Sequence, residues 1–303
     1  MQTRGGGMNY TEQLNAALNF GLLVDVLECD GQLHRVSTQL KSKGKNGWYI
    51  AFNESPTLVM GDWQTGITET WKPDGYKQTH NERIAIQQAI KAAEAERVKN
   101  HALATRQALD IYSHAKPIIE HQYLINKGIN APSVIRCKDN LLIVPLVDYS
   151  LDKPALINVQ TINAQGFKKF TKGGRVTGLC CPIELPSNEP LTRLYIAEGF
   201  STAVSVHQIT GYPVLAAMNA NNLTPVAKIA RQRWPDVEII ITGDDDYLTE
   251  RKTGINTGKD KAINAASLIR AKTAFPPFTF EQKLAGLTDW NDYEQSLNNK
   301  AVS

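Results

Sequence analysis

Hydrophobic positions in the second half of the chain alternate between short, strand-like runs and longer segments with helical spacing. The strand-like runs, each followed by a helix-like segment, are 194–197 before 201–210, 214–217 before 223–234, and 237–242 before 258–272. Strands that alternate with helices of about ten residues or more typically build a parallel sheet covered by helices on both faces. Two further strands at 141–147 and 156–162, and a helix at 118–127 that ends at Gly128, are predicted before this region.

The first half of the chain has a different pattern. A short helix over 8–20 precedes β-like runs at 22–27, 33–36, 47–52 and 57–60. Turn residues such as Asp30-Gly31 separate these runs, which indicates a small β-rich module. Residues 79–115 contain neither Gly nor Pro and have few apolar positions, so this segment is predicted to be a solvated helical connector.

These patterns predict an α/β chain, α+β overall, with four parts. The parts are a β-rich module over 8–75, a helical connector over 76–116, an α+β subdomain over 117–190 and an α/β domain over 191–295. The length of 303 residues agrees with more than one domain.

Composition excludes several classes of protein. With 42% apolar and 21% charged residues and a net charge of +3, the chain is typical of a globular protein. No apolar run approaches the ~20 residues that cross a bilayer, so no membrane is expected, and the polar first nine residues do not resemble a secretory signal. The four cysteines form no C-x-x-C pair and indicate no disulfide framework, which favours a cytoplasmic protein over a secreted one. The six histidines form no H-x-x-H pattern, so a zinc hydrolase is not expected.

Carboxylates follow two of the predicted parallel strands, at the edge where such sheets gather functional groups. Glu198 follows 194–197, Asp244 and Asp246 follow 237–242, and Asp289 and Asp292 come later. Converging carboxylates stay ionised together only if a cation neutralises them, and oxygen ligands without His or Cys suit Mg²⁺ or Mn²⁺. Residues i and i+2 of an extended strand share a face, so Asp244 and Asp246 are expected to bind one ion, with Asp245 pointing elsewhere.

The alternative for any one of these acids is a solvated loop charge or the N-cap of a helix. Glu198 itself is suited either to bind a metal or to transfer a proton. Gly199, which follows it, is expected to allow a tight turn from strand to helix.

A second feature is the segregation of positive charge. No Asp or Glu occurs from Lys153 to Ile183. Within this stretch, the run GFKKFTKGGR holds Phe167, Lys168, Lys169, Phe170, Lys172 and Arg175. Cations follow phosphates and exposed aromatic rings stack on bases, so these four cations are predicted to bind template phosphates or a nucleoside triphosphate. The alternative is a basic hairpin whose Phe residues belong to the core.

Polar residues elsewhere are expected at the same edge of the sheet. Asn256 and Lys259 begin a predicted helix, where backbone N–H groups favour anions, at the end of a loop over 247–261. Asn219 follows the second strand of the alternating region and is expected to line a nucleotide pocket, although an N-cap role fits it equally well.

The motifs together resemble the Toprim domain, which bacterial-type primases, type IA and II topoisomerases and some nucleases share. The segments that carry this likeness are Ala197-Glu198-Gly199, Gly243 to Asp246 and Asp289 to Asp292. A closer likeness is to the Toprim-domain DNA primases of plasmids, phages and other mobile elements. That likeness extends to HQYLINKGI (121–129), LLIVPLVD (141–148), LINVQTINAQGFKKFTKGG (156–174) and, in the N-terminal module, GWYIAF and GDWQTG.

The resemblance implies a DNA primase that makes short RNA primers de novo on single-stranded DNA from NTPs, during replication of a mobile genetic element. Glu198 would act as general base on a nucleotide 3′-hydroxyl. Asp244 and Asp246 would hold Mg²⁺ or Mn²⁺, and Asp289 and Asp292 resemble the later acidic positions of the family. The implied partners are the DNA template, NTPs and a separate replicative helicase or replication initiator.

The sequence departs from bacterial chromosomal primases in one respect, because it has no Cys/His set for their N-terminal zinc-binding domain. It also lacks a G-x-x-x-x-G-K-[ST] motif, so the chain is not itself expected to be a helicase. Two alternatives stay open. One is a Toprim nuclease that uses the same acids to activate water, and the other is a catalytically idle primase relative that binds single-stranded DNA or a replication partner.

Overall fold

The computed structural model describes residues 10–63, 65–186 and 190–302, with side chains described up to residue 298. The chain divides into two compact units, Met1–Lys99 and Asn100–Ser303, which are described one at a time. Residues 8–9 of the first predicted helix lie outside the described residues. The four-part division of the chain stays a prediction.

The first unit contains a five-stranded antiparallel sheet whose strands follow one another in chain order. Its elements are α1 (Tyr10–Phe20), β1 (Leu22–Leu23), β2 (His34–Thr38), β3 (Gly47–Phe52), β4 (Ser55–Asp62) and β5 (Ile67–Trp71). Alternate residues of β3 face opposite sides of the sheet. Tyr49 packs in a cluster with Ala17 of α1, whereas Trp48 and Ile50 pack in a second cluster with Ile86 of α2 (His80–Ser113).

The long helix α2 is more than a solvated connector. Ile86 and Ala93 belong to a core cluster of the first unit, and Ala108 belongs to a core cluster of the second unit with Ile143 and Val159. Other apolar positions, such as Val98 and Leu103, are exposed as the sparse pattern predicted. The buried alanines explain the difference, because their small side chains give only a weak apolar stripe in the sequence.

The second unit is built on a ten-stranded sheet. Its strands are β6 (Lys116–Pro117), β7 (Arg136–Lys138), β8 (Leu141–Asp148), β9 (Ala155–Ile162), β10 (Lys168–Phe170), β11 (Leu179–Ile183), β12 (Arg193–Ala197), β13 (Val214–Ala216), β14 (Glu238–Thr242) and β15 (Lys272–Ala274). The main order is β10-β9-β8-β11-β13-β12-β14-β15, with β7 pairing β6 and β8. The pairs β13–β12, β12–β14 and β14–β15 are parallel, while β11 joins them to the antiparallel strands.

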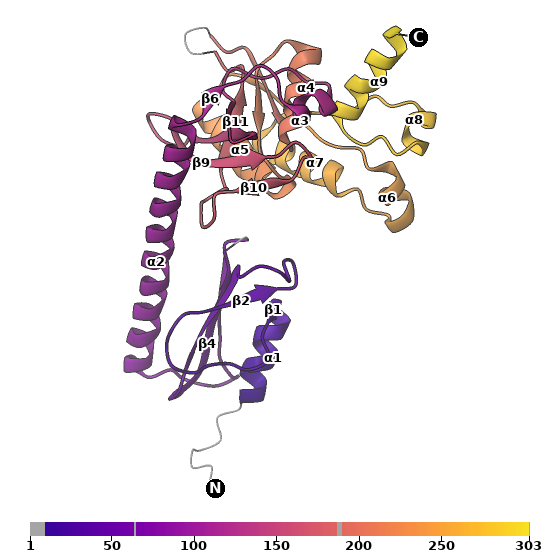
Figure 1. Ribbon diagram of the computed structural model, residues 1–303. Helices are drawn as coiled ribbons and strands as arrows, with labels where there is room; N and C mark the ends of the chain where they lie inside the picture. The colour runs from indigo at the N-terminus through magenta and orange to yellow at the C-terminus, as the bar shows by residue number, and fades with distance from the viewer. Residues whose placement is uncertain (1–9, 64, 187–189, 303) are drawn as a thin grey trace. The chain divides into compact units, whose positions relative to one another are not determined.

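Helices cover both faces of the parallel strands, which confirms the predicted α/β architecture (Figure 1). On one face α4 (Phe200–Thr210) packs Phe200 and Ala203 into the larger core cluster. On the other face α5 (Leu223–Arg233) and α7 (Thr257–Ile269) close a second cluster. The strand β11 contributes residues to both clusters, because Cys181 lies in the first cluster and Cys180 in the second. All four cysteines are free, and Cys29 and Cys137 are half-buried.

Several elements differ from the sequence-based expectation. The helix predicted over 118–127 is limited to α3 (Gln122–Lys127), although Gly128 ends it in the left-handed conformation, at φ 62°, as predicted. The loop predicted over 247–261 contains α6 (Tyr247–Thr253), and α8 (Phe280–Leu284) and α9 (Trp290–Val302) follow later. The helices α6 and α8 have only seven and five residues, so their stability depends on tertiary contacts.

In the part of the chain that the structure describes, no helix combines the length and the apolar character needed to cross a bilayer.

Candidate active site

Two acidic residues leave neighbouring parallel strands at the same edge of the sheet. The strands β12 and β14 are hydrogen-bonded neighbours, with Ile196 opposite Ile241, so Glu198 and Asp244 follow their carboxyl ends side by side. Asp289, just before α9, joins them, and all three line one cavity of about 630 Å³. The other polar side chains around this cavity are Tyr123, Asn126, Lys127, Gln165, Lys168, Ser201, Thr202 and Gln295.

Of the three acids, Asp244 has the negative charge that its surroundings stabilise least. Its Oδ1 atom is buried and has no hydrogen-bond partner among the described residues. Burial, followed by repulsion from Glu198, Asp289, Asp292 and Asp246, raises the pKa of Asp244 to about 8. A carboxylate in this state binds a proton or a cation in preference to remaining a bare charge.

The two other acids of the cavity are perturbed in the same direction. Burial is the main cause that raises the pKa of Glu198, and repulsion from Asp289 adds to it. Burial likewise raises the pKa of Asp289. Lys168 partly offsets the shift of Glu198 and Lys127 that of Asp289, so two cations from β10 and α3 act on the acids of this cavity.

This donor set fits a divalent cation bound through oxygen. The buried, unpartnered oxygen of Asp244 and the mutual repulsion of the acids are both relieved by a positive ion. The carboxylates do not form a compact set like that of Glu28, Asp30 and His34, the one group among the described residues whose ligand atoms all lie within 4.8 Å of one another. A wider spacing suits an ion that keeps several waters and binds one or two carboxylates, as Mg²⁺ does.

The neighbours of Asp244 have separate roles in the structure. Asp245 points away from the cavity and is buried against Lys259, at 3.0 Å, and Lys283, at 2.8 Å. The side chain of Asp246 accepts a hydrogen bond from the backbone N–H of Thr249 and so caps α6. Asp246 therefore acts on Asp244 through its charge but does not line the cavity.

Asp289 and Asp292 cap the start of α9 reciprocally. Asp289 Oδ1 accepts from the backbone N–H of Asp292 at 2.8 Å, while Asp292 Oδ2 accepts from the N–H groups of Thr288 and Asp289. This arrangement resembles a capping box. It occupies the carboxylate of Asp292, and only Asp289 of this pair lines the cavity.

Of the basic residues predicted to bind phosphate, the structure brings Lys168 to the cavity. Lys169 and Lys172 are exposed on and just after β10, and Arg175 is ion-paired with the buried Asp148. The two Phe residues of this run differ, because Phe167 is 70% exposed while Phe170 packs against the larger core cluster. The run thus combines a partly buried hairpin with an exposed basic and aromatic surface.

The predicted polar residues at the other loops serve as helix caps and in ion pairs. Asn219 caps the short helix η1 (Ala220–Asn222) by accepting from the backbone N–H of Asn222. Asn256 caps α7 and donates to Asp245 at 3.1 Å, and Lys259 is paired with Asp245 and Glu250. None of these three lines the cavity that holds Asp244.

Several residues that line the cavity were not identified from the sequence. Lys127 and Tyr123 lie within the HQYLINKGI segment, whose likeness to primases was the available signal, whereas nothing in the sequence marked Ser201 and Thr202. Gly199 does not need glycine for its backbone, because its φ is −111° and an added Cβ would meet nothing closer than 3.6 Å.

The part of the chain that contains the acidic residues is similar to a known domain family. Residues 193–299 match the family model of the Toprim domain, and Toprim domains generally bind divalent metal ions.

Most of the chain is also similar to two DNA primases. It is 30% identical over 257 residues to a DNA primase TraC of Escherichia coli, and 28% identical over 277 residues to a second DNA primase TraC of the same organism. These matches cover 82% and 86% of this chain but only 24% and 19% of the relatives, so the chain spans about a quarter or less of their length. Among solved structures, the primase fragment of the bacteriophage T7 primase-helicase protein matches with a TM-score of 0.38 and 16% identity, over 61% of this chain and 68% of that one.

Proposed function

We propose that this chain carries the catalytic core of a DNA primase, which makes short RNA primers de novo on single-stranded DNA from NTPs in the replication of a plasmid or another mobile genetic element. The observation that carries the proposal is the cavity in which Glu198, Asp244 and Asp289 meet Lys127 and Lys168. Acids that hold a cation and lysines that bind phosphates are the groups that phosphoryl transfer needs. The similarity to the TraC primases supports the same conclusion.

Asp244 is proposed as the main ligand of Mg²⁺ or Mn²⁺, with Glu198 and Asp289 beside it and Asp246 and Asp292 contributing charge. When bound, the ion would neutralise these carboxylates and stabilise the negative charge of the phosphates. Lys127 and Lys168 are proposed to bind the triphosphate of the incoming nucleotide from the side of the cavity formed by α3 and β10.

Glu198 is proposed as the general base. Its carboxylate would take the proton of the 3′-hydroxyl, whose oxygen then bonds to the α-phosphorus of the incoming nucleotide. The bond between the α-phosphorus and its bridging oxygen breaks, and pyrophosphate leaves. Burial raises the pKa of Glu198, which brings its basicity nearer to neutral pH, where a general base is most effective.

The template is proposed to follow the exposed surface next to the cavity. Phe167 offers an uncovered ring, and Lys169 and Lys172 offer exposed cations near it. Such a combination binds single-stranded nucleic acid through stacking and phosphate contacts. A separate replicative helicase or replication initiator is the proposed protein partner.

The test is primer synthesis by the full chain on single-stranded DNA with labelled NTPs and Mg²⁺ or Mn²⁺. Wild type is expected to make short RNA products, and Glu198→Gln to reduce their rate by roughly 10²–10⁴-fold through loss of a general base. Asp244→Asn is expected to lose both activity and metal affinity. Asp152→Asn, a change to an exposed acid outside the cavity, serves as the matched control and should behave like wild type.

Other products would identify the alternatives. Cleavage of DNA without NTPs, abolished by Asp244→Asn, would identify a nuclease that activates water. Binding of single-stranded DNA without synthesis or cleavage would identify a binding protein and overturn the proposal.

A further inference from the structure

The first turn of α4 forms part of the wall of the candidate active-site cavity. Two residues of this turn, Ser201 and Thr202, line the cavity. They are only 5% and 4% exposed, so the surrounding protein covers nearly all of each residue. A buried hydroxyl is normally hydrogen-bonded, because losing water without gaining a partner costs free energy.

These two hydroxyls have no partner in the part of the chain that the structure describes. No described residue hydrogen-bonds to the side chain of Ser201 or Thr202. A Cβ on Gly199 would lie 3.6 Å from Oγ1 of Thr202, so this hydroxyl lies at the beginning of the helix. A ligand in the cavity is therefore the partner that these hydroxyls can reach.

The backbone of the same turn adds further donors. The N-cap residue, Gly199, provides no side chain to cap α4, and the N–H of Ala203 makes the first hydrogen bond within the helix, to the carbonyl of Gly199 at 2.9 Å. The N–H groups of residues 200–202 thus have no partner within the helix. The start of an 11-residue helix also carries partial positive charge, and free N–H groups at such a position bind phosphate oxygens.

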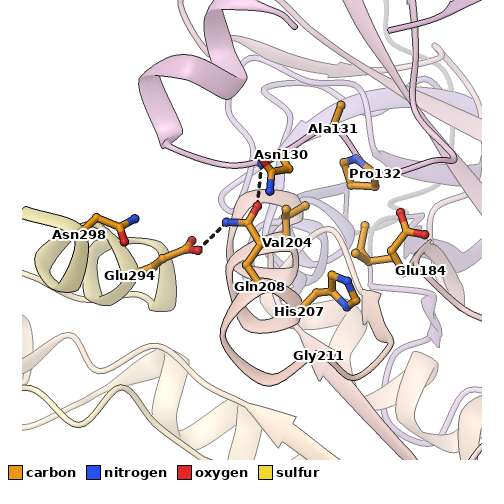
Figure 2. Close-up of a pocket in the computed structure, with 11 residues that line it drawn as sticks. Asn130, Ala131, Pro132, Glu184, Val204, His207, Gln208, Gly211, Glu294 and Asn298 are labelled. Atoms are coloured by element: carbon orange, nitrogen blue, oxygen red, sulfur yellow. Dashed lines mark hydrogen bonds between the residues drawn. The ribbon is translucent and has the colours of Figure 1, made fainter. Parts of the chain in front are cut away.

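The other end of α4 shows how polar groups are paired where the protein itself supplies the partners. It borders a second cavity, of about 620 Å³, beside α9 (Figure 2). There Gln208 uses both ends of its amide, since Nε2 donates to Glu294 and Oε1 accepts from the backbone N–H of Asn130 at 2.6 Å (Figure 2). Ser201 and Thr202 make no such bonds, which points to a ligand at the first turn.

The charges around the first turn indicate which anion fits. Lys127 and Lys168 line the same cavity and favour a ligand with several negative charges. Glu198, Asp244 and Asp289 also line it, and they repel an anion that arrives without a cation. A phosphate chain accompanied by a divalent ion satisfies both requirements.

We propose that the first turn of α4 binds a phosphate group of the incoming nucleoside triphosphate, through the hydroxyls of Ser201 and Thr202 and the N–H groups of residues 200–202. This inference rests on the proposed function, because it assigns a further contact to the nucleotide of that reaction. The two residues bind substrate and take no part in proton transfer.

The experiment measures binding of inorganic tripolyphosphate to the full chain by calorimetry, with Mg²⁺ and without template. Ser201→Ala and Thr202→Val each remove one hydroxyl and keep most of the side chain. Each is expected to weaken binding roughly tenfold, as for loss of a hydrogen bond to a charged group. The melting temperature should not fall, because neither hydroxyl has a partner in the described fold. Ser267→Ala, an exposed position on α7, is the matched control and should bind like wild type.

A second measurement needs no variant. The backbone amide NMR signals of residues 200–202 in wild type are expected to shift saturably with tripolyphosphate and to stay unchanged with adenosine, which lacks phosphate. Unchanged affinity in both variants, no binding by wild type, or amide signals that do not respond would overturn the proposal. So would variants that lose affinity for a single-stranded DNA oligonucleotide and keep it for tripolyphosphate, because the turn would then contact the template.

Primer synthesis separates this inference from the proposed function. If wild type makes primers and the KM for NTPs is unchanged in both variants, the phosphate contact is wrong and the proposed function stands. If wild type binds tripolyphosphate through this turn but makes no primers, the proposed function fails and the phosphate contact stands.

Discussion

At the scale of single residues, the acidic run after β14 places consecutive carboxylates in opposite environments. Asp244 lines the candidate active-site cavity and has an oxygen without a donor among the described residues, whereas Asp245 is buried among donors from Lys259, Lys283 and Asn256. This follows from the alternation of side chains at the end of an extended strand. Asp245 thus joins α7 and α8 to the strand end that presents Asp244, and it stabilises the fold beside the site.

We therefore expect Lys283→Met to lower the free energy of unfolding by roughly 1–3 kcal/mol, because it removes one partner of a buried carboxylate. Urea unfolding of the full chain measures this. Lys272→Met is the matched control, since Lys272 pairs with Glu238 in a solvent-exposed position where water screens the attraction. An equal loss of unfolding free energy in the two variants would contradict this prediction, because it would show that the burial of Asp245 does not strengthen its ion pair.

Two glycines beside the acids are expected to differ in their tolerance of a methyl group. A Cβ on Gly243 would lie 2.5 Å from Cε1 of Phe275 and 2.7 Å from Cβ of Ala262, whereas a Cβ on Gly199 has room. Gly243→Ala should therefore cost roughly 1–3 kcal/mol of stability through overpacking, and Gly199→Ala should be nearly neutral. Thermal unfolding of both variants checks this, and a destabilised Gly199→Ala would contradict it.

At the scale of elements, the start of α2 is defined by a capping box. The backbone N–H of Thr79 donates to Glu82 at 2.6 Å, and the N–H of Glu82 donates to the Thr79 hydroxyl at 3.2 Å. The hydroxyl of Tyr76 donates to the other oxygen of the same carboxylate. The Tyr76 hydrogen bond is the main cause that lowers the pKa of Glu82 to about 2.

This lowered pKa gives a pH-dependent contribution to stability. Because the folded pKa lies below its ordinary value of 4.5, the contribution is complete above about pH 4.5 and is lost as the pH falls toward 2. Glu82→Gln should lower the melting temperature at pH 7 and differ less from wild type near pH 2. Melting curves by circular dichroism at both values test this against Glu96→Gln, an exposed acid of the same helix; a pH-independent difference would contradict it.

Elements with strong periodicity could be predicted from the sequence, and those that depend on distant partners could not. The strands β12 and β14 and the helices α4 and α5 lie where continuous apolar runs and helical spacing placed them. The strands β7 and β15 and the helices α6 and α8 have three to seven residues, so their sequences contain little periodic signal.

The candidate site follows the same division. The shared sheet edge of Glu198 and Asp244 followed from strand alternation, since parallel neighbours end together. The use of Arg175, Asn256 and Lys259 in ion pairs and caps did not, because each meets a partner, such as Asp148 or Asp245, whose position only the fold determines.

At the scale of the whole molecule, each of the two units has core clusters of its own. Leu58 is fully buried in the cluster of the first unit that includes Tyr49 and Met60. Leu215 is buried in the cluster of the second unit that α5 and α7 close. Separate cores allow one unit to lose stability while the other keeps it.

We expect Leu58→Ala to destabilise the first unit by about 2–5 kcal/mol, the usual cost of a cavity in a core. Hydrogen exchange should become faster in β3 and β4 and stay unchanged in β12 and β14. Leu215→Ala should give the reverse pattern and serves as the matched control. Faster exchange in both units for either variant would show that they unfold together.

The distribution of cysteines has a practical consequence for measuring the distance between the units. Cys180 and Cys181 are sealed inside the cores, whereas Cys29 in the first unit and Cys137 in the second are each partly accessible. Burial raises the pKa of both accessible thiols, so maleimide labelling needs a mildly alkaline buffer. The chain thus offers one attachment point per unit for a donor–acceptor dye pair or two spin labels, and the distance between the units becomes measurable without introducing any cysteine.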